Sequence, residues 1–293
     1  MTETTLSRII VGTDFNELAA SALRFAGAIA ARSGAELTVV YADTFEPPAE
    51  FTASQVRRIA ESIERSRSRA REQLERHVAD HVVHGVKTKV AVLEGSPAAA
   101  IARIAERQGA DFIALGTHGR GGVQRLMVGS VAETVMREAR VPVLTVRSTA
   151  TPGSIRRVLC PVNASDISVI AVDRAAQMAR AVGAELTLIH VAKAGDCHPF
   201  DIEALIPRDV RTTIKKCEIE HDDPAAEILA AEEHGEYDLI VIGAEHKLVR
   251  DITIFGTTTA AVTRHARTPV LTVTRHAARA EAALPIGADH HVV

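Results

Sequence analysis

The chain has 293 residues, a formal net charge of −3, and a composition that is 46% hydrophobic and 3% aromatic, with no tryptophan. This length predicts about two domains of roughly 150 residues each, and aliphatic cores are typical of parallel α/β sheets. Intermixed charges give no reason to expect a nucleic acid partner. The three cysteines lack metal-ligand spacing, and we see neither a signal peptide nor an apolar run of membrane-helix length. We therefore expect a cytoplasmic protein with no membrane partner.

The first half of the sequence reads, in chain order, as alternating strands and helices. Strands are expected at 8–13, 37–42, 86–94, 111–116 and 141–146, and helices at 16–34, 53–81, from Pro97 onward, and at 130–139. Asn16 is a suitable N-cap and Gly34 a suitable C-terminal cap for the first helix. This alternation predicts right-handed crossovers and a parallel, doubly wound sheet.

The second half repeats the first. RIIVGTDFN at 8–16 matches RVLCPVNAS at 157–165, and GAELTVVYA at 34–42 matches GAELTLIHV at 183–191, both with an offset of 149. Further along, 111–116 matches 238–243 with an offset of 127, so the second copy is 22 residues shorter. We therefore predict two tandem open, doubly wound parallel five-stranded sheets flanked by helices. The expected domains are 1–147 and 155–275, with a linker at 148–154 and a tail at 276–293.

A cluster of glycines follows the fourth strand of the first copy. Gly116 ends this strand, Gly119 follows within the loop, and Gly129 and Ser130 open the next helix. A helix N-terminus favours anions, and glycines allow close approach of the backbone and a positive φ that turns amides toward an anion. Glycines at such junctions also serve simply to relieve turn strain. The residues alone indicate a phosphate or another oxyanion.

The spacing Gly116-x2-Gly119-x9-Gly129-Ser130, together with VGTDFN in the first strand, resembles the nucleotide-binding pattern of the universal stress protein family. The resemblance covers nearly the whole chain as two copies and implies an adenine nucleotide alpha hydrolase-like, Rossmann-like fold. It also implies ATP with Mg as the ligand. The phosphates would lie against the glycines, Ser130 and Arg120, and Asp14 would act on the ribose or metal side. Backbone near Ala42 would read adenine.

The second copy retains this pattern only in part. Gly243, Gly256 and Thr257 survive, but His246 stands in place of Gly119 and Asn163 in place of Asp14. We therefore expect the first copy to hold most of the nucleotide. A weaker second site would use Asn163, Val191, Gly243, Gly256 and Thr257.

The sequence favours a sensing or regulatory role in the stress response over catalysis. It contains no P-loop motif. Arg120 and Arg125 are candidates for phosphate contacts, although loop arginines are more often simply solvated charges. Slow ATP hydrolysis remains open. The alternatives are a slow ATP hydrolase or nucleotidyl-transferring enzyme, and an adaptor that binds no nucleotide.

Three further features of the sequence carry expectations. The final strands, 141–146 and 269–273, are expected to pair edge to edge as an intramolecular pseudo-two-fold, and a homodimer of the whole chain is plausible. His77, His81 and His84 have helical spacing and suit either zinc or, by preference, an exposed helix end. Cys160 is expected to be buried and Cys197 to lie in a polar loop.

Overall fold

The computed structural model describes residues 5–43, 53–117, 129–147, 155–193, 200–219, 223–235, 237–249 and 252–275. The first half contains β1 (Arg8–Gly12), α1 (Glu17–Ser33), β2 (Glu36–Asp43), α2 (Ala53–His81), β3 (Thr88–Glu94), α3 (Pro97–Gln108), β4 (Phe112–Gly116), α4 (Ser130–Glu138) and β5 (Val143–Val146). The second half contains β6 (Arg157–Val162), α5 (Asp166–Val182), β7 (Glu185–Lys193), a 3-10 turn η1 (Glu203–Leu205), β8 (Thr212–Ile219), α6 (Pro224–Gly235), β9 (Leu239–Ala244), β10 (His246–Val249), β11 (Ile252–Phe255), α7 (Thr257–His265) and β12 (Val270–Thr274). This is the α/β architecture that the alternating pattern predicts.

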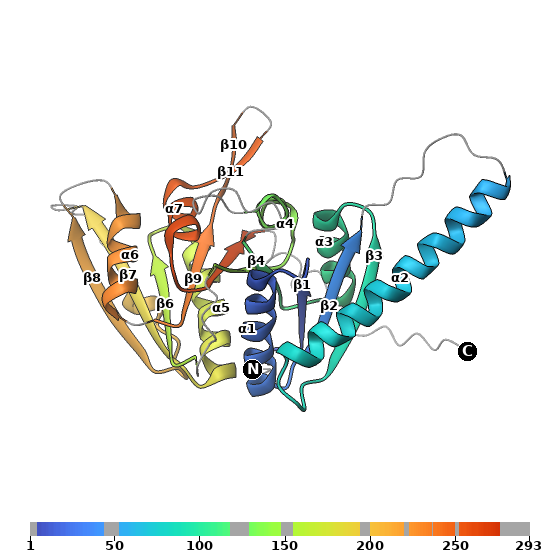
Figure 1. Cartoon of the computed structure of the whole chain (residues 1–293). Helices are drawn as coiled ribbons and strands as arrows, with labels where there is room; N and C mark the ends of the chain where they lie inside the picture. The colour runs from blue at the N-terminus through green and yellow to red at the C-terminus, as the bar shows by residue number, and fades with distance from the viewer. Residues whose placement is uncertain are drawn as a thin grey trace, which may run out of the picture.

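Ten of these strands form one continuous sheet, in the order β3-β2-β1-β4-β5-β12-β9-β6-β7-β8 (Figure 1). Neighbours within each half of this sheet are parallel, and the one antiparallel pair in the ten-stranded sheet is β5 with β12, where Leu144 lies opposite Leu271. This pairing confirms that the two final strands join within one chain. The free edge of β5 is thereby paired with β12, and the free edge of β12 with β5, so that two otherwise exposed strand edges are removed.

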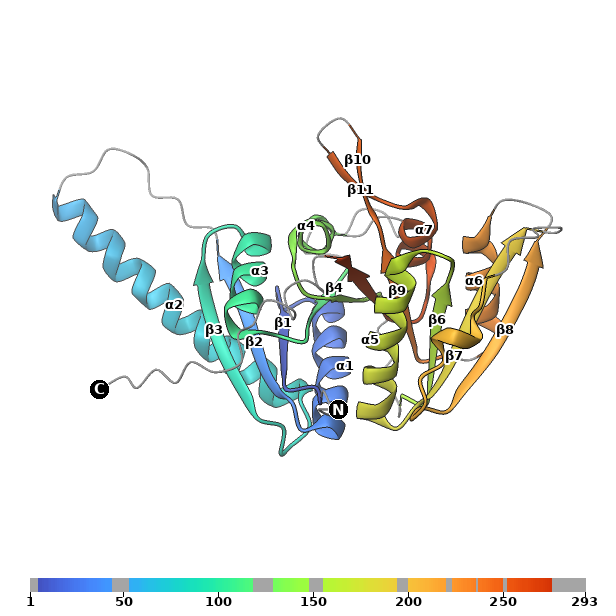
Figure 2. The same cartoon turned by 180° about the vertical axis from the view of Figure 1, so that it is seen from behind.

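Helices cover both faces of this sheet. Residues of α1, α2 and α5 share one hydrophobic core, whereas α3 with α4, and α6 with α7, contribute to two separate cores on the other side. The view from behind shows α1 and α5 next to each other at the middle of the molecule (Figure 2). The first of these cores therefore spans both halves of the sheet.

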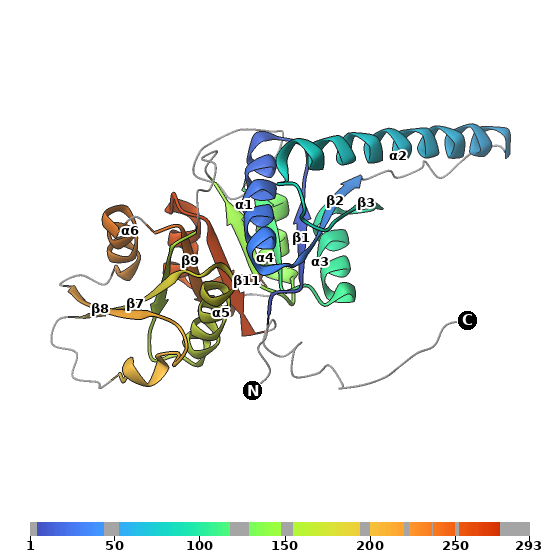
Figure 3. The same ribbon diagram turned by 90° about the horizontal axis from the view of Figure 1, so that it is seen from below.

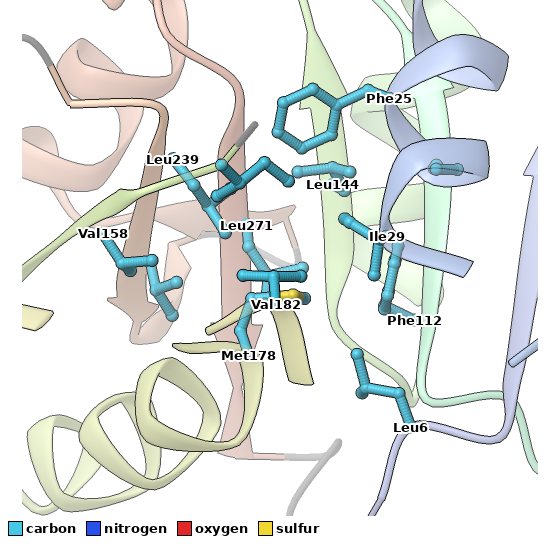
Figure 4. Close-up of a cluster of buried hydrophobic side chains, with 14 of the residues drawn as sticks. Leu6, Phe25, Ile29, Phe112, Leu144, Val158, Met178, Val182, Leu239 and Leu271 are labelled. Carbon is cyan, nitrogen blue, oxygen red and sulfur yellow. The ribbon is translucent and has the colours of Figure 1, made fainter. Parts of the chain in front are cut away.

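Figure 4 shows this shared core in close-up. Phe25 and Ile29 of α1, Leu144 of β5, Leu271 of β12, and Met178 and Val182 of α5 belong to the same buried cluster. Their exposed fractions are 3% or less. Burial of apolar surface stabilises by roughly 25 cal/mol per Å², so the halves stabilise each other through this cluster as well as through the β5–β12 pair.

Local signals fix the ends of several elements as the sequence predicts. Asn16 caps α1, with its Oδ1 accepting a hydrogen bond from the Ala19 amide at 2.7 Å. Gly34 and Gly183 end α1 and α5 in the left-handed region, with φ of 77° and 65°. Pro97 occupies the first turn of α3. Ser165 stands at the corresponding N-cap of α5, but its side chain makes no capping bond.

The two halves differ in the element that follows their second strand. In the first half, α2 extends far beyond the body of the sheet (Figure 3). Among its residues 61–81, for which burial is described, the buried ones are Leu74, His77 and Val78. In the second half, the shorter segment around η1 takes this place. There Ile202 is fully buried and Phe200 stacks on His190, with ring centroids 4.8 Å apart. The second half is thus 22 residues shorter because a short turn takes the place of the long helix α2.

Between β9 and α7 of the second half, β10 and β11 form an antiparallel hairpin that stands out from the sheet (Figure 1). The sequence analysis did not predict it. The corresponding segment of the first half, 118–128, lies outside the described residues.

Candidate functional site

A cavity opens at the carboxyl end of the sheet in the first half. Its walls come from the loop after β1 (Gly12, Thr13 and Asp14), the end of β2 (Tyr41 and Ala42), Gly116 of β4, and Gly129 and Ser130 at the start of α4. Its volume is about 140 Å³. The strand order reverses here, since β1 lies between β2 and β4, and open α/β sheets bind ligands at such a switch point. This cavity is therefore lined by five of the residues that the sequence singled out: Asp14, Ala42, Gly116, Gly129 and Ser130.

The start of α4 supplies backbone amides to this cavity. The Glu133 amide makes the first intrahelical hydrogen bond, to the Gly129 carbonyl at 2.9 Å. No described residue accepts a hydrogen bond from the amides of Ser130, Val131 or Ala132, and α4 has no side-chain cap. The Gly129 amide is already engaged, since it donates to the Thr117 carbonyl. Three amides at a positive helix end are suited to an anion.

Asp14 is held in place by its neighbours. The backbone amide and side-chain Nδ2 of Asn16 donate to the Asp14 carboxylate, at 3.2 and 3.1 Å. Between them, Phe15 has a φ of 66°, which is uncommon for a residue with a side chain. The Phe15 ring packs against Tyr41, with centroids 4.9 Å apart. The turn after β1 is therefore constrained by packing and presents Asp14 at a fixed position.

The reason that position 116 must be glycine differs from our expectation. Gly116 is not among the described residues with positive φ, and Gly129 has a φ of −56°. An added Cβ at Gly116 would lie 2.7 Å from the Ala19 nitrogen and 2.7 Å from the Leu18 carbonyl carbon. The expectation of a positive φ at these two glycines is therefore wrong. Gly116 instead allows the start of α1 to pack directly on the end of β4.

Two expected ligand residues of the first half, Gly119 and Arg120, lie outside the described residues, as do Arg125 and Cys197. Sequence reasoning missed Thr13, Tyr41, Val131 and Ala132, which also line the cavity. The first three are direct chain neighbours of Asp14, Ala42 and Ser130, and Ala132 lies two residues after Ser130. Closeness in sequence to the motif residues was therefore the signal that could have found them.

The second half has its own cavity at the corresponding place. Asn163, Val191, Gly243, Gly256 and Thr257 all line it, and its volume is about 290 Å³. Ser165, Ser168, Glu245 and Thr259 also contribute to its wall and were not anticipated. Of these two corresponding cavities, that of the second half is the larger, although the sequence favours the first half for nucleotide. His246, at the position of Gly119, belongs to strand β10.

The histidines of α2 divide between two environments. His77 is only 8% exposed, and its Nε2 lies 3.3 Å from the hydroxyl of Thr13. The preference for an exposed face is therefore wrong for His77, because Phe15 and Tyr41 extend the core to meet α2. Burial, and next the proximity of His81, lowers the pKa of His77 below its ordinary value. Among the described residues, no group of three or more potential ligands is arranged to hold a metal.

A mostly parallel α/β sheet with a cavity at its switch point defines a protein of the Rossmann-like class of folds. The family model for the universal stress protein family matches residues 5–147, 154–199 and 201–274. The chain belongs to the universal stress protein family.

Individual relatives agree with this assignment. The universal stress protein MJ0531 of Methanocaldococcus jannaschii is 32% identical over 149 residues, which cover 50% of this chain and 84% of the relative. A universal stress protein of Thermus aquaticus is 35% identical over 140 residues, covering 47% of this chain and 97% of the relative. Each of these relatives matches about half of this chain.

Among solved structures, a universal stress protein from Archaeoglobus fulgidus resembles nearly the whole chain. The TM-score is 0.68 at 21% identity, with 92% of this chain and 98% of that chain covered. The likeness therefore extends to the arrangement of both halves. None of the helices in the described part of the chain combines the length and apolar character needed to cross a bilayer.

Proposed function

We propose that this protein is a cytoplasmic, ATP-binding regulator of a stress response, with the nucleotide held mainly by the first half. The observation that carries the proposal is the joining of Asp14, Ala42, Gly116 and Ser130 around one cavity. The first-turn amides of α4 are suited to a phosphate, and the carboxylate of Asp14 suits the ribose or a nucleotide-bound Mg²⁺. The family resemblance points to the same ligand.

The residues fit one part of such a ligand better than the whole. A volume of about 140 Å³ is below the range of roughly 300–1,000 Å³ for sites that bury a drug-sized ligand. The described residues therefore enclose only part of such a ligand. Gly119 and Arg120 remain proposed contacts for its phosphates.

We favour a binding role over catalysis. Of the described residues that line this cavity, Asp14 and Tyr41 are the ones with ionisable side chains. Asp14 accepts two hydrogen bonds from Asn16, which favours a fixed ligand contact over a general base. Nucleotide binding would regulate the protein by changing which partners its surface can bind. Self-association of the whole chain belongs to this proposal as well.

The test is the binding of ATP with Mg²⁺, measured by calorimetry on two matched variants. Ser130 and Thr257 occupy equivalent positions at the starts of α4 and α7, and both are exposed. Ser130→Trp should reduce ATP affinity at least about tenfold, because the indole fills the cavity mouth. Thr257→Trp should leave the tightest ATP site unchanged. Failure of the unmodified chain to bind ATP, or equal binding by Ser130→Trp, would reject the proposal.

A further inference from the structure

The cavity of the second half differs in chemistry from its counterpart. Its volume of about 290 Å³ lies near the lower end of the range for small-molecule sites. Aliphatic side chains and polar groups share its wall equally, and Ile167, Ile189, Val191 and Ile242 form its aliphatic part. Such a wall suits the flat, weakly polar body of a small organic ligand.

The polar groups in this cavity are mostly uncharged. Asn163, which replaces the carboxylate Asp14, accepts hydrogen bonds at Oδ1 from the hydroxyls of Ser165 and Ser168, at 2.6 and 2.9 Å. Its Nδ2 group, a donor, has no acceptor among the described residues. Thr257 and Thr258 add hydroxyl groups at the start of α7. These groups recognise hydroxyl and carbonyl oxygens without requiring a charge on the ligand.

Glu245 brings a negative charge to the same wall. It follows Gly243 by two residues at the end of β9 and lines the cavity. Its carboxylate lies 3.5 Å from the guanidinium of Arg275, which also lies 3.4 Å from Asp166. Two carboxylates thus share one described cation at this rim. A polyphosphate placed here would meet an excess of negative charge, and such like-charge contacts oppose binding.

We propose that the cavity of the second half binds an uncharged, hydroxyl-bearing small molecule of nucleoside size and discriminates against nucleoside phosphates. The cavity volume sets the size, the aliphatic part of the wall accepts the body of the ligand, and Asn163 with the serine and threonine hydroxyls recognises its polar edge. Glu245 excludes the phosphate groups. This inference concerns a different cavity from the proposed ATP site and stands independently of it.

The first experiment uses adenosine as the probe, with binding to the full-length Ser130→Trp variant measured by calorimetry. Blocking the first cavity in this way isolates the second. We expect one adenosine per chain, and at least about tenfold weaker binding once Thr257→Trp is added. Absence of adenosine binding, or binding that Thr257→Trp does not weaken, would overturn the proposal. If the unmodified chain binds no ATP, the function proposed for the first half fails, but this adenosine result keeps its meaning.

The second experiment tests the role of Glu245 by a gain of binding. In the Ser130→Trp background, Glu245→Gln should strengthen ATP binding at least about tenfold, because it removes a repulsive charge and releases Arg275 toward the phosphates. Glu233→Gln is the matched control, since Glu233 pairs with Arg267 at 3.1 Å on the exposed surface. ATP binding to the Ser130→Trp variant as tight as that of adenosine would overturn the proposal, as would equal effects of the two glutamine variants.

Discussion

The packing of α1 against Gly116 leads to a stability prediction that separates packing from ligand binding. A Cβ added by Gly116→Ala would lie 2.7 Å from the Ala19 nitrogen, 2.7 Å from the Leu18 carbonyl carbon and 2.9 Å from the Leu18 oxygen. All three are main-chain atoms, so no side-chain rotation relieves the overlap. Overpacking typically costs about 1–3 kcal/mol. We expect the free energy of unfolding to fall by about 3 kcal/mol, because α1 or β4 must shift.

Two glycines of the second half provide controls with smaller expected effects: Gly243, which corresponds to Gly116, and Gly256, which corresponds to Gly129. Gly243→Ala would place its Cβ 3.0 and 3.1 Å from side-chain atoms of Ile167, which can move partly aside, and 3.2 Å from the Ile167 carbonyl oxygen. We expect a loss of about 1 kcal/mol, at the low end of overpacking. Gly256→Ala meets no atom within 4 Å and has a φ of −55°, so its effect should stay within about 0.5 kcal/mol.

The assay is urea denaturation followed by far-ultraviolet circular dichroism, with the three variants compared at unchanged m-values. The order of destabilisation should be Gly116→Ala, then Gly243→Ala, then Gly256→Ala. A Gly116→Ala protein as stable as the unmodified chain would refute the packing argument, and so would an equal loss in Gly256→Ala.

Two further predictions concern the core. Burial lowers the pKa of His77 most, and the nearby charges of His81 and Arg24 lower it further, whereas Asp80 and Asp14 oppose this shift. Just below the ordinary pKa of about 6.5, the unfolded chain therefore binds a proton at His77 that the folded chain does not. The free energy of unfolding consequently falls as the pH drops below about 6.5. His77→Gln should flatten this dependence between about pH 7 and 5 in urea titrations, and a slope equal to that of the unmodified chain would contradict it. Ile29→Ala, at a fully buried position of the shared core, should cost about 2–5 kcal/mol and accelerate hydrogen exchange in β7 of the other half, whereas unchanged protection of β7 would mean that the halves unfold independently.

The sequence by itself determined the elements and their order, because the signals for them are local. The apolar runs and helical periodicity identified the strands and helices. The cap at Asn16 and the C-terminal glycines Gly34 and Gly183 depend only on residues within one turn of the helix. Duplication of these signals established the two halves, and the exposed-edge argument anticipated the β5–β12 pair. The β10–β11 hairpin was not predicted, because the sequence between Gly243 and Gly256 was interpreted only through its partial match to the glycine pattern of the first half.

Only the tertiary structure decided which residues meet across the chain. It brought Leu18 and Ala19 against Gly116, about a hundred positions apart, and it buried His77 beside Thr13. It also showed Glu245 in the wall of the second cavity. These contacts depend on how crossover connections place helices on the sheet, which no local pattern specifies. Sequence motifs therefore located the two cavities, whereas the packing of α1 and α2 and the charge beside β9 determine how each cavity is built.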